Sequence, residues 1–185
     1  MKISSNLLLD DITHQLEQYI AEAEALKALP LTHLNWRATE TAWSVLECLE
    51  HLSLYADFYV PEIKKSIANT THRQPAAVFT AGWLGNYFAK SMLPKEKLNK
   101  MKTFKDKNPL GSQLGYHTID RFIALHRQLL QLVQAAQKVD INKTKTGISI
   151  TKLLRLKLGD TFRFVVNHVY RHMVQAKKAL AAQKA

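Results

Sequence analysis

The sequence predicts an all-α protein, a four-helix bundle with a long crossover connection between its second and third helices. Four segments repeat apolar residues at the spacing of an amphipathic helix, and residues 69–114 separate the middle two. Alternation typical of a β-strand occurs only briefly, at residues 148–151. The 185 residues are 46% hydrophobic, which is enough for one domain, residues 1–185, with a sizeable core.

The first helix is expected over residues 6–28, where the apolar positions form one stripe and Pro30 then stops the helix. The stripe consists of Leu8, Ile12, Leu16, Tyr19, Ile20, Ala23 and Leu26. His14 lies away from this stripe, so we expect it to face solvent.

The second helix is expected from Ser44 to about residue 68. Ser44 followed three residues later by Glu47 predicts a capping box, in which two side chains satisfy otherwise unpaired amides. Trp43, directly before the cap, is placed to act as a hydrophobic staple. Pro61 falls inside this helix and is expected to kink it, because proline cannot bond back to a preceding carbonyl.

The connection over residues 69–114 is weakly periodic, with a short helix expected at residues 83–92. The third helix is expected over residues 115–138 and carries an apolar face of Ile119, Phe122, Ile123, Leu129, Leu130 and Val133. The fourth is expected to begin at Asp160, a good N-cap residue, and to end near residue 182.

The net charge of +11 is unevenly distributed. Residues 1–62 hold 3 basic and 10 acidic side chains, whereas residues 63–185 hold 23 and 5. Such an excess suits nucleic acid, an anionic membrane or acidic substrates, and it is equally typical of a lysine-rich soluble surface. Residues 90–107 hold seven lysines but no arginine and a single aromatic residue, Phe104, so a solvated loop is favoured over a nucleic-acid interface. The charge leaves one function open that is not enzymatic. In this alternative the protein is a basic bundle that binds nucleic acid or a protein partner in a stress response.

The single cysteine, Cys48, excludes an intrachain disulfide framework and is expected to be a small core residue. The longest uncharged stretch, which includes residues 76–89, is too short to span a bilayer. The first residues lack the apolar run of a signal peptide. We therefore expect a soluble, cytoplasmic protein without membrane contact.

Three histidines are expected to point into the bundle. His168 and His172 are one helical turn apart, among apolar residues of the fourth helix, and His51 lies on the apolar face of the second. Neutral imidazoles placed in this way can bind one divalent cation, and sharing a metal would relieve the cost of burying them. The alternative is that each is a hydrogen-bonded core residue, as we expect for His126.

Glu47 lies one turn before His51 on the same helix face. It is the candidate general base or a hydrogen-bond partner of a metal ligand, although its place in the capping box is a sufficient alternative role. Tyr55 and Arg171 are candidates for orienting a substrate, although a core tyrosine and a surface arginine are the favoured interpretations.

Two segments resemble the DinB/YfiT-like superfamily. Residues 43–52, with Trp43-Ser44, then Glu47 and then His51-Leu52, are similar to the segment that opens the family's second helix. Residues 158–176, with the pattern His-x-x-x-His-x-x-Gln-Ala, are similar to its last helix. Residues 101–105 also resemble the branch of the family that has a lengthened crossover. The resemblance covers nearly the whole chain.

The resemblance implies a four-helix bundle with a three-histidine metal site, which maps to His51, His168 and His172, with zinc or nickel as the metal. Relatives include bacillithiol-using S-transferases, a mycothiol-dependent isomerase and hydrolases without a known substrate. It therefore implies a metal-dependent hydrolase or thiol S-transferase that acts on a small, anionic substrate. A low-molecular-weight thiol is a candidate cosubstrate, and a homodimer is expected by resemblance only. Fold alone does not decide among these activities.

Overall fold

The computed structural model describes residues 1–94 and 103–183 of the chain. Four long helices dominate it: α1 (Ser5–Leu26), α3 (Val45–Asn69), α5 (Tyr116–Ala136) and α6 (Leu158–Ala182). They correspond to the four helices expected from the periodicity, with ends that differ by at most two residues. The prediction of an all-α bundle is confirmed.

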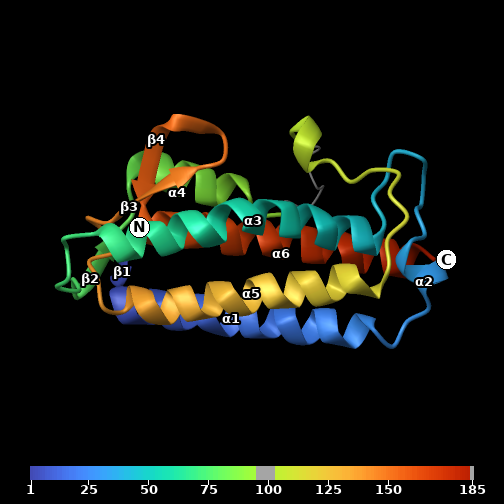
Figure 1. Ribbon diagram of the computed structural model, residues 1–185, viewed down its shortest axis with the longest axis horizontal. Coiled ribbons are helices and arrows are strands. Elements are labelled where there is room, and N and C mark those ends of the chain that lie inside the picture. Colours follow the sequence, from blue (N-terminus) through green and yellow to red (C-terminus); the bar gives the residue numbers. More distant parts are fainter. Residues whose placement is uncertain (95–102, 184–185) are drawn as a thin grey trace.

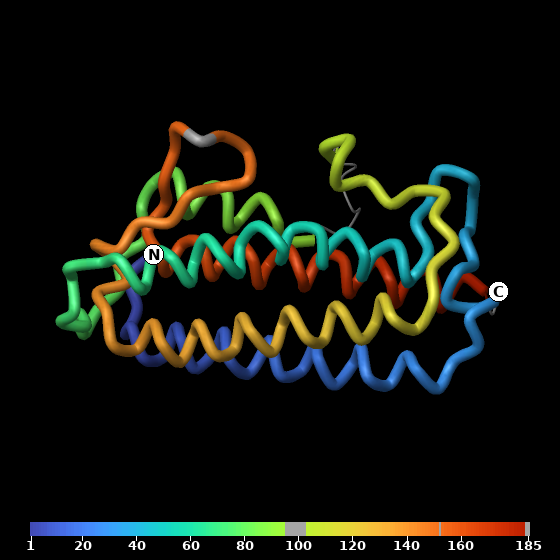
Figure 2. Tube along the Cα trace, in the orientation of Figure 1, coloured from blue at the N-terminus to red at the C-terminus, as the bar shows by residue number. Residues whose placement is uncertain are grey.

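The four helices lie side by side along the long axis of the molecule (Figure 1). Following the chain in Figure 2, α1 and α6 run in one direction, and α3 and α5 run in the other. Because α3 ends at one end of the bundle and α5 begins at the opposite end, the chain between them must cross the whole length of the molecule. This geometry explains the long crossover connection.

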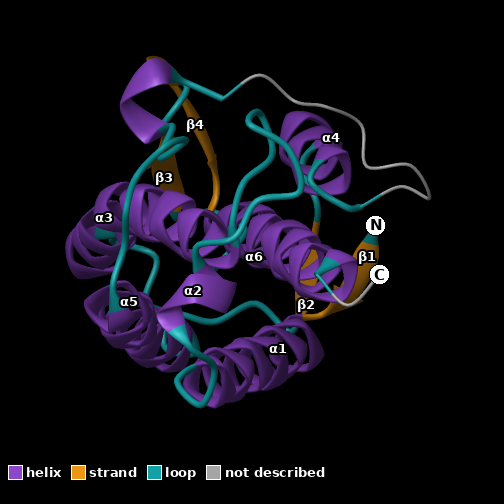
Figure 3. Ribbon diagram, turned by 90° about the vertical axis from the view of Figure 1, so that its right-hand side faces the viewer, coloured by secondary structure: helices purple, strands orange, loops and turns teal. Residues whose placement is uncertain are grey.

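The first residues of the chain, the crossover and the loops carry the short elements. They are α2 (Leu31–Leu34), α4 (Trp83–Ser91), the 3₁₀ turn η1 (Lys105–Lys107), and four short strands, β1 (Lys2–Ser4), β2 (Val78–Thr80), β3 (Lys145–Ile148) and β4 (Thr151–Lys157). The strands form two antiparallel pairs, β1 with β2 and β3 with β4. Seen from one end in Figure 3, α4 and the β3–β4 hairpin lie outside the bundle, on the side of α3 and α6.

Helix α3 begins as its capping box predicts. The amide of Glu47 donates to the Ser44 hydroxyl at 3.2 Å, and the amide of Ser44 donates to the Glu47 carboxylate at 2.7 Å. The helix then continues through Pro61 to Asn69. His51 therefore lies in the second turn of a helix whose start is firmly fixed.

Helix α6 begins at Leu158, two residues before the predicted N-cap, so the prediction for Asp160 was wrong. The loop between α5 and β3 supplies the acceptors that a capping side chain would otherwise provide: the amide of Leu158 donates to Thr144 O at 2.9 Å, and that of Gly159 donates to Ile141 O at 3.1 Å. Asp160 lies in the first turn and instead accepts from the amide of Gly82, directly before α4, at 2.8 Å.

The core follows the predicted apolar stripes. The predicted residues of the first helix are buried or partly buried, and so are those of the third. His14 is exposed, as expected, and Cys48 is fully buried. Among the described residues, no helix is both long and apolar enough to span a membrane.

Candidate metal centre

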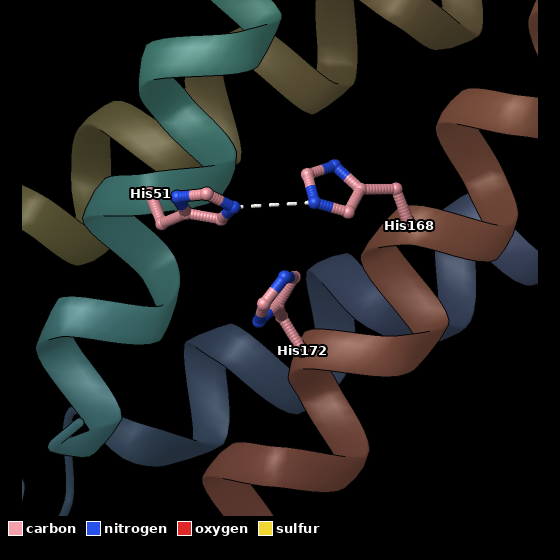
Figure 4. A group of neighbouring side chains, drawn as sticks. All are labelled: His51, His168 and His172. Carbon is pink, nitrogen blue, oxygen red and sulfur yellow. Dashed lines mark hydrogen bonds between the residues drawn. The ribbon is translucent and has the colours of Figure 1, made fainter. Parts of the chain in front are cut away.

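Three histidines from two helices converge inside the bundle. His51 comes from α3, and His168 and His172 come from successive turns of α6 (Figure 4). One ring nitrogen from each lies within 4.8 Å of the others. The Nε2 atoms of His51 and His168 are 3.2 Å apart. The three side chains singled out by their helix faces are therefore brought together.

Two of the three rings are held by their other nitrogen. His51 Nδ1 lies 2.6 Å from the backbone oxygen of Lys107, in η1 of the crossover. Because a carbonyl oxygen can only accept, Nδ1 must carry the proton and Nε2 must present a lone pair. His172 Nδ1 is likewise 3.0 Å from Gln175 Oε1. An outer partner on Nδ1 that leaves Nε2 for coordination is the usual arrangement of metal-binding histidines.

The spacing also fits a metal. Two nitrogens at about 2.0 to 2.1 Å from a tetrahedral zinc ion lie about 3.3 to 3.4 Å apart, and the observed separation of 3.2 Å is close to this value. Three imidazoles fill three positions and leave at least one open, which is the arrangement of catalytic rather than structural zinc sites. The residues present therefore fit a divalent metal.

Burial keeps the three imidazoles neutral. His51, His168 and His172 are 3%, 7% and 8% exposed. Burial lowers the pKa of His51 to about 4, although its bond to the Lys107 carbonyl acts in the opposite direction. Burial, reinforced by the neighbouring histidines, holds the pKa values of His168 and His172 well below 6.5. Neutral imidazole is the form that binds a metal, so the site is competent at neutral pH.

Aromatic rings surround the cluster. Trp43 stacks on His172 with the ring centroids 5.5 Å apart, and it also contacts His51. Tyr55 contacts both His51 and His168, at 4.9 and 4.8 Å between centroids. These rings fix the orientation of the imidazoles and reduce access of water to them.

Glu47 is fully buried and its carboxylate is saturated with hydrogen bonds. Arg37 donates to both oxygens at 2.8 Å, Ser44 donates its amide to Oε2, and the amide of Gly111 donates to Oε1 at 2.6 Å. Burial alone would raise the pKa of Glu47, but these bonds outweigh it and leave the pKa below its usual value. All four acceptor positions of the carboxylate are in use.

The remaining candidates have mixed outcomes. Arg171 is 6% exposed, so the expectation of a surface arginine was wrong. It directly precedes His172 in α6, and in addition to burial its positive charge lowers the pKa values of His168 and His172. His126 is buried away from the cluster, stacked on Phe122 with Nδ1 2.7 Å from its carbonyl oxygen, as expected of a core histidine.

Sequence reasoning missed the partners that come from loops. Arg37, Lys107 and Gly111 are brought to α3 by the crossover and by the α2–α3 connection, and no short-range pattern announces them. Residues 95–102 lie outside the described part of the chain. They include part of the lysine-rich crossover and the first two residues of the segment 101–105 that was used in the family resemblance.

The comparisons with known proteins identify a family. Residues 15–176 match the model of the DinB superfamily, so the match covers most of the chain and includes all three histidines. The searches of curated proteins and of solved structures gave no match. The predicted resemblance is confirmed: the chain belongs to the DinB superfamily.

Proposed function

We propose that this protein is a metal-dependent enzyme that acts on a small molecule, as a hydrolase or as a thiol S-transferase. The observation that carries the proposal is the convergence of three buried, neutral imidazoles whose ligand atoms lie within 4.8 Å of one another. Zinc and nickel, which both accept imidazole ligands, are the proposed metals.

The donor set itself suggests the kind of ligand at the open position. A divalent metal lowers the pKa of a bound water or thiol toward neutrality and so supplies the nucleophile. His51, His168 and His172 are neutral, so they leave the full double charge uncompensated, and the described part of the cluster contains no carboxylate. An anionic ligand, such as a thiolate or a carboxylate-bearing substrate, would therefore be favoured over a neutral one. Arg171, buried beside the cluster, adds further positive potential.

Within this proposal Glu47 has a positioning role and not a proton-transfer role. Its saturated carboxylate holds the start of α3 next to Trp43, and it holds Gly111 in the loop that follows Lys107. These are the segments that contact the histidine rings. The hydrogen bonds that lower the pKa of Glu47 also make it a weak base.

Paired assays test the proposal and distinguish hydrolase activity from thiol S-transferase activity. The protein loaded with zinc or nickel is assayed with simple esters alone, and with an electrophile plus a low-molecular-weight thiol. We expect metal-dependent turnover in one assay, lost in His168→Ala and retained in His126→Gln, which changes a buried histidine outside the cluster. Turnover that survives in His168→Ala, or that does not require metal, would overturn the proposal.

A further inference from the structure

A concave surface lies far from the histidines. A groove of about 750 Å³ runs between the last turns of α3 and the β3–β4 hairpin. Glu62, in its wall, follows His51 by about 16 Å along the axis of α3. The volume falls within the range of about 300 to 1,000 Å³ that is typical of small-molecule sites. The groove is therefore separate from the candidate metal centre and large enough for its own ligand.

The groove collects cations. Lys65, Lys143, Lys145 and Arg155 line it, against the single acidic residue Glu62. Within the described part of the chain, none of these four cations forms an ion pair with a carboxylate. Like charges gathered in this way repel one another unless an anion lies between them. Threonine and serine hydroxyls line the same groove and add hydrogen-bonding capacity.

The walls of the groove are held in place. The amide of Gly147 donates to Glu62 at 3.1 Å, and a Cβ atom at Gly147 would lie 2.8 Å from the Glu62 carboxylate, so glycine permits this close approach of β3 to α3. The Tyr59 hydroxyl bonds to both the hydroxyl and the amide of Ser149, in the turn of the hairpin. The carboxylate that could compete for the cations is thus partly occupied by the backbone of the hairpin.

The end of α3 also lies in this groove, and the negative end of its helix dipole would oppose an anion. Arg73 offsets this effect because it donates to the carbonyl oxygens of Ile67 and Ala68, at 3.1 and 2.6 Å. On the opposite wall, Arg155 uses one of its five N–H donors for a hydrogen bond to the carbonyl oxygen of Lys145. The local balance of charge stays positive.

We propose that this groove, lined by Lys65, Lys143, Lys145 and Arg155, is a binding site for a phosphorylated small molecule. Arginine and lysine side chains are the usual partners of phosphate oxygens, and several cations around one cavity suit a multiply charged phosphate better than a single carboxylate. The proposal stands independently of the metal centre.

Isothermal titration with inorganic pyrophosphate, at physiological salt and without added metal, tests it. We expect saturable binding to one site, weakened at least tenfold in Lys143→Gln/Arg155→Gln. The control Lys64→Gln/Lys178→Gln removes the same charge from two exposed lysines outside the groove, and it should bind as the wild type does. Equal weakening in both double variants, or no saturable binding in the wild type, would overturn the proposal.

Two further arms distinguish the groove from the metal centre and from a nucleic-acid site. Pyrophosphate chelates divalent metals, so the titration is repeated with His172→Ala; unchanged affinity supports the groove, whereas lost binding assigns the pyrophosphate to the metal centre and overturns the proposal. A single-stranded oligonucleotide is then tested in competition with pyrophosphate. If the oligonucleotide binds through Lys143 and Arg155 and pyrophosphate does not displace it, the groove binds nucleic acid, and the small-molecule proposal is overturned.

Discussion

Replacing Glu47 by glutamine separates the structural role of this residue from a catalytic one. The carboxylate accepts four hydrogen bonds in a fully buried position, two of them from Arg37. Glutamine retains one accepting oxygen and turns an NH₂ group toward two donors, so at least two charge-assisted bonds are lost. At about 1.5 to 3 kcal/mol each, this agrees with the loss of about 3 to 5 kcal/mol measured when buried ion pairs are broken.

For a chain of this length each kcal/mol shifts Tm by about 2 to 4 °C, so Glu47→Gln should lower Tm by about 6 to 20 °C in thermal unfolding followed by circular dichroism. The matched control is Glu50→Gln on the same helix. Its carboxylate pairs with Arg121 near the surface, and its loss should cost about 1 kcal/mol or less.

The pH dependence has a definite sign. Because the folded protein holds the pKa of Glu47 below its usual 4.5, the stability that it contributes is present above that pH and is lost as the pH falls further. The difference in Tm between wild type and Glu47→Gln should shrink accordingly. A variant that keeps the wild-type Tm but loses activity would refute this reasoning and identify Glu47 as a general base.

Three more predictions concern His126, Gly85 and Gln175. Burial lowers the pKa of His126 to about 4, so between pH 7 and 5 the unfolded chain takes up a proton that the folded protein excludes, and the free energy of unfolding falls by about 2 kcal/mol. In His126→Gln the fall of Tm over this pH interval should be smaller than in the wild type, and an equal fall would contradict a neutral, buried His126. A Cβ atom at Gly85 would overlap the carboxyl group of Asp160, so Gly85→Ala should lower the free energy of unfolding, measured in urea, by about 1 to 3 kcal/mol. An unchanged value would show that α4 does not pack against α6 at Asp160. Gln175→Ala removes the partner of His172 Nδ1 and should weaken zinc binding about 10- to 100-fold in a competition titration, whereas unchanged affinity would dismiss this bond as an anchor.

The helices and the inward histidines could be predicted because they depend on local patterns. The apolar stripe around His168 and His172, and the capping box of Ser44 and Glu47, each lie within a few residues of sequence. The turn of a helix therefore fixes which side chains share a face before any tertiary contact forms.

The contacts that complete the site could not be predicted in this way. The carbonyl of Lys107 reaches His51 across 56 residues, and the amide of Gly111 reaches Glu47 across 64. Both are backbone groups, which every residue carries, so residue type gives no signal. The start of α6 was misplaced for the same reason: the backbone of a distant loop supplied the acceptors in place of a capping side chain.

The small sheets show a related limit. Strands β1 and β2 are three residues each and pair residues 2–4 with residues 78–80. Segments this short contain less than two periods of alternation, so periodicity cannot distinguish them from loop. The hairpin of β3 and β4 overlaps the brief alternation at residues 148–151, but its pairing is irregular between Gly147 and Ile148.

The metal content of the protein tests directly whether His51, His168 and His172 form a metal site. The chain is purified without a histidine tag, exposed to zinc or nickel, desalted and analysed by mass spectrometry of the elements, beside His51→Ala, His168→Ala and the exposed-histidine control His14→Ala. We expect about one metal ion per chain in the wild type and in His14→Ala, and far less in His51→Ala and His168→Ala. A wild type without bound metal, or cluster variants that hold as much as the wild type, would contradict it.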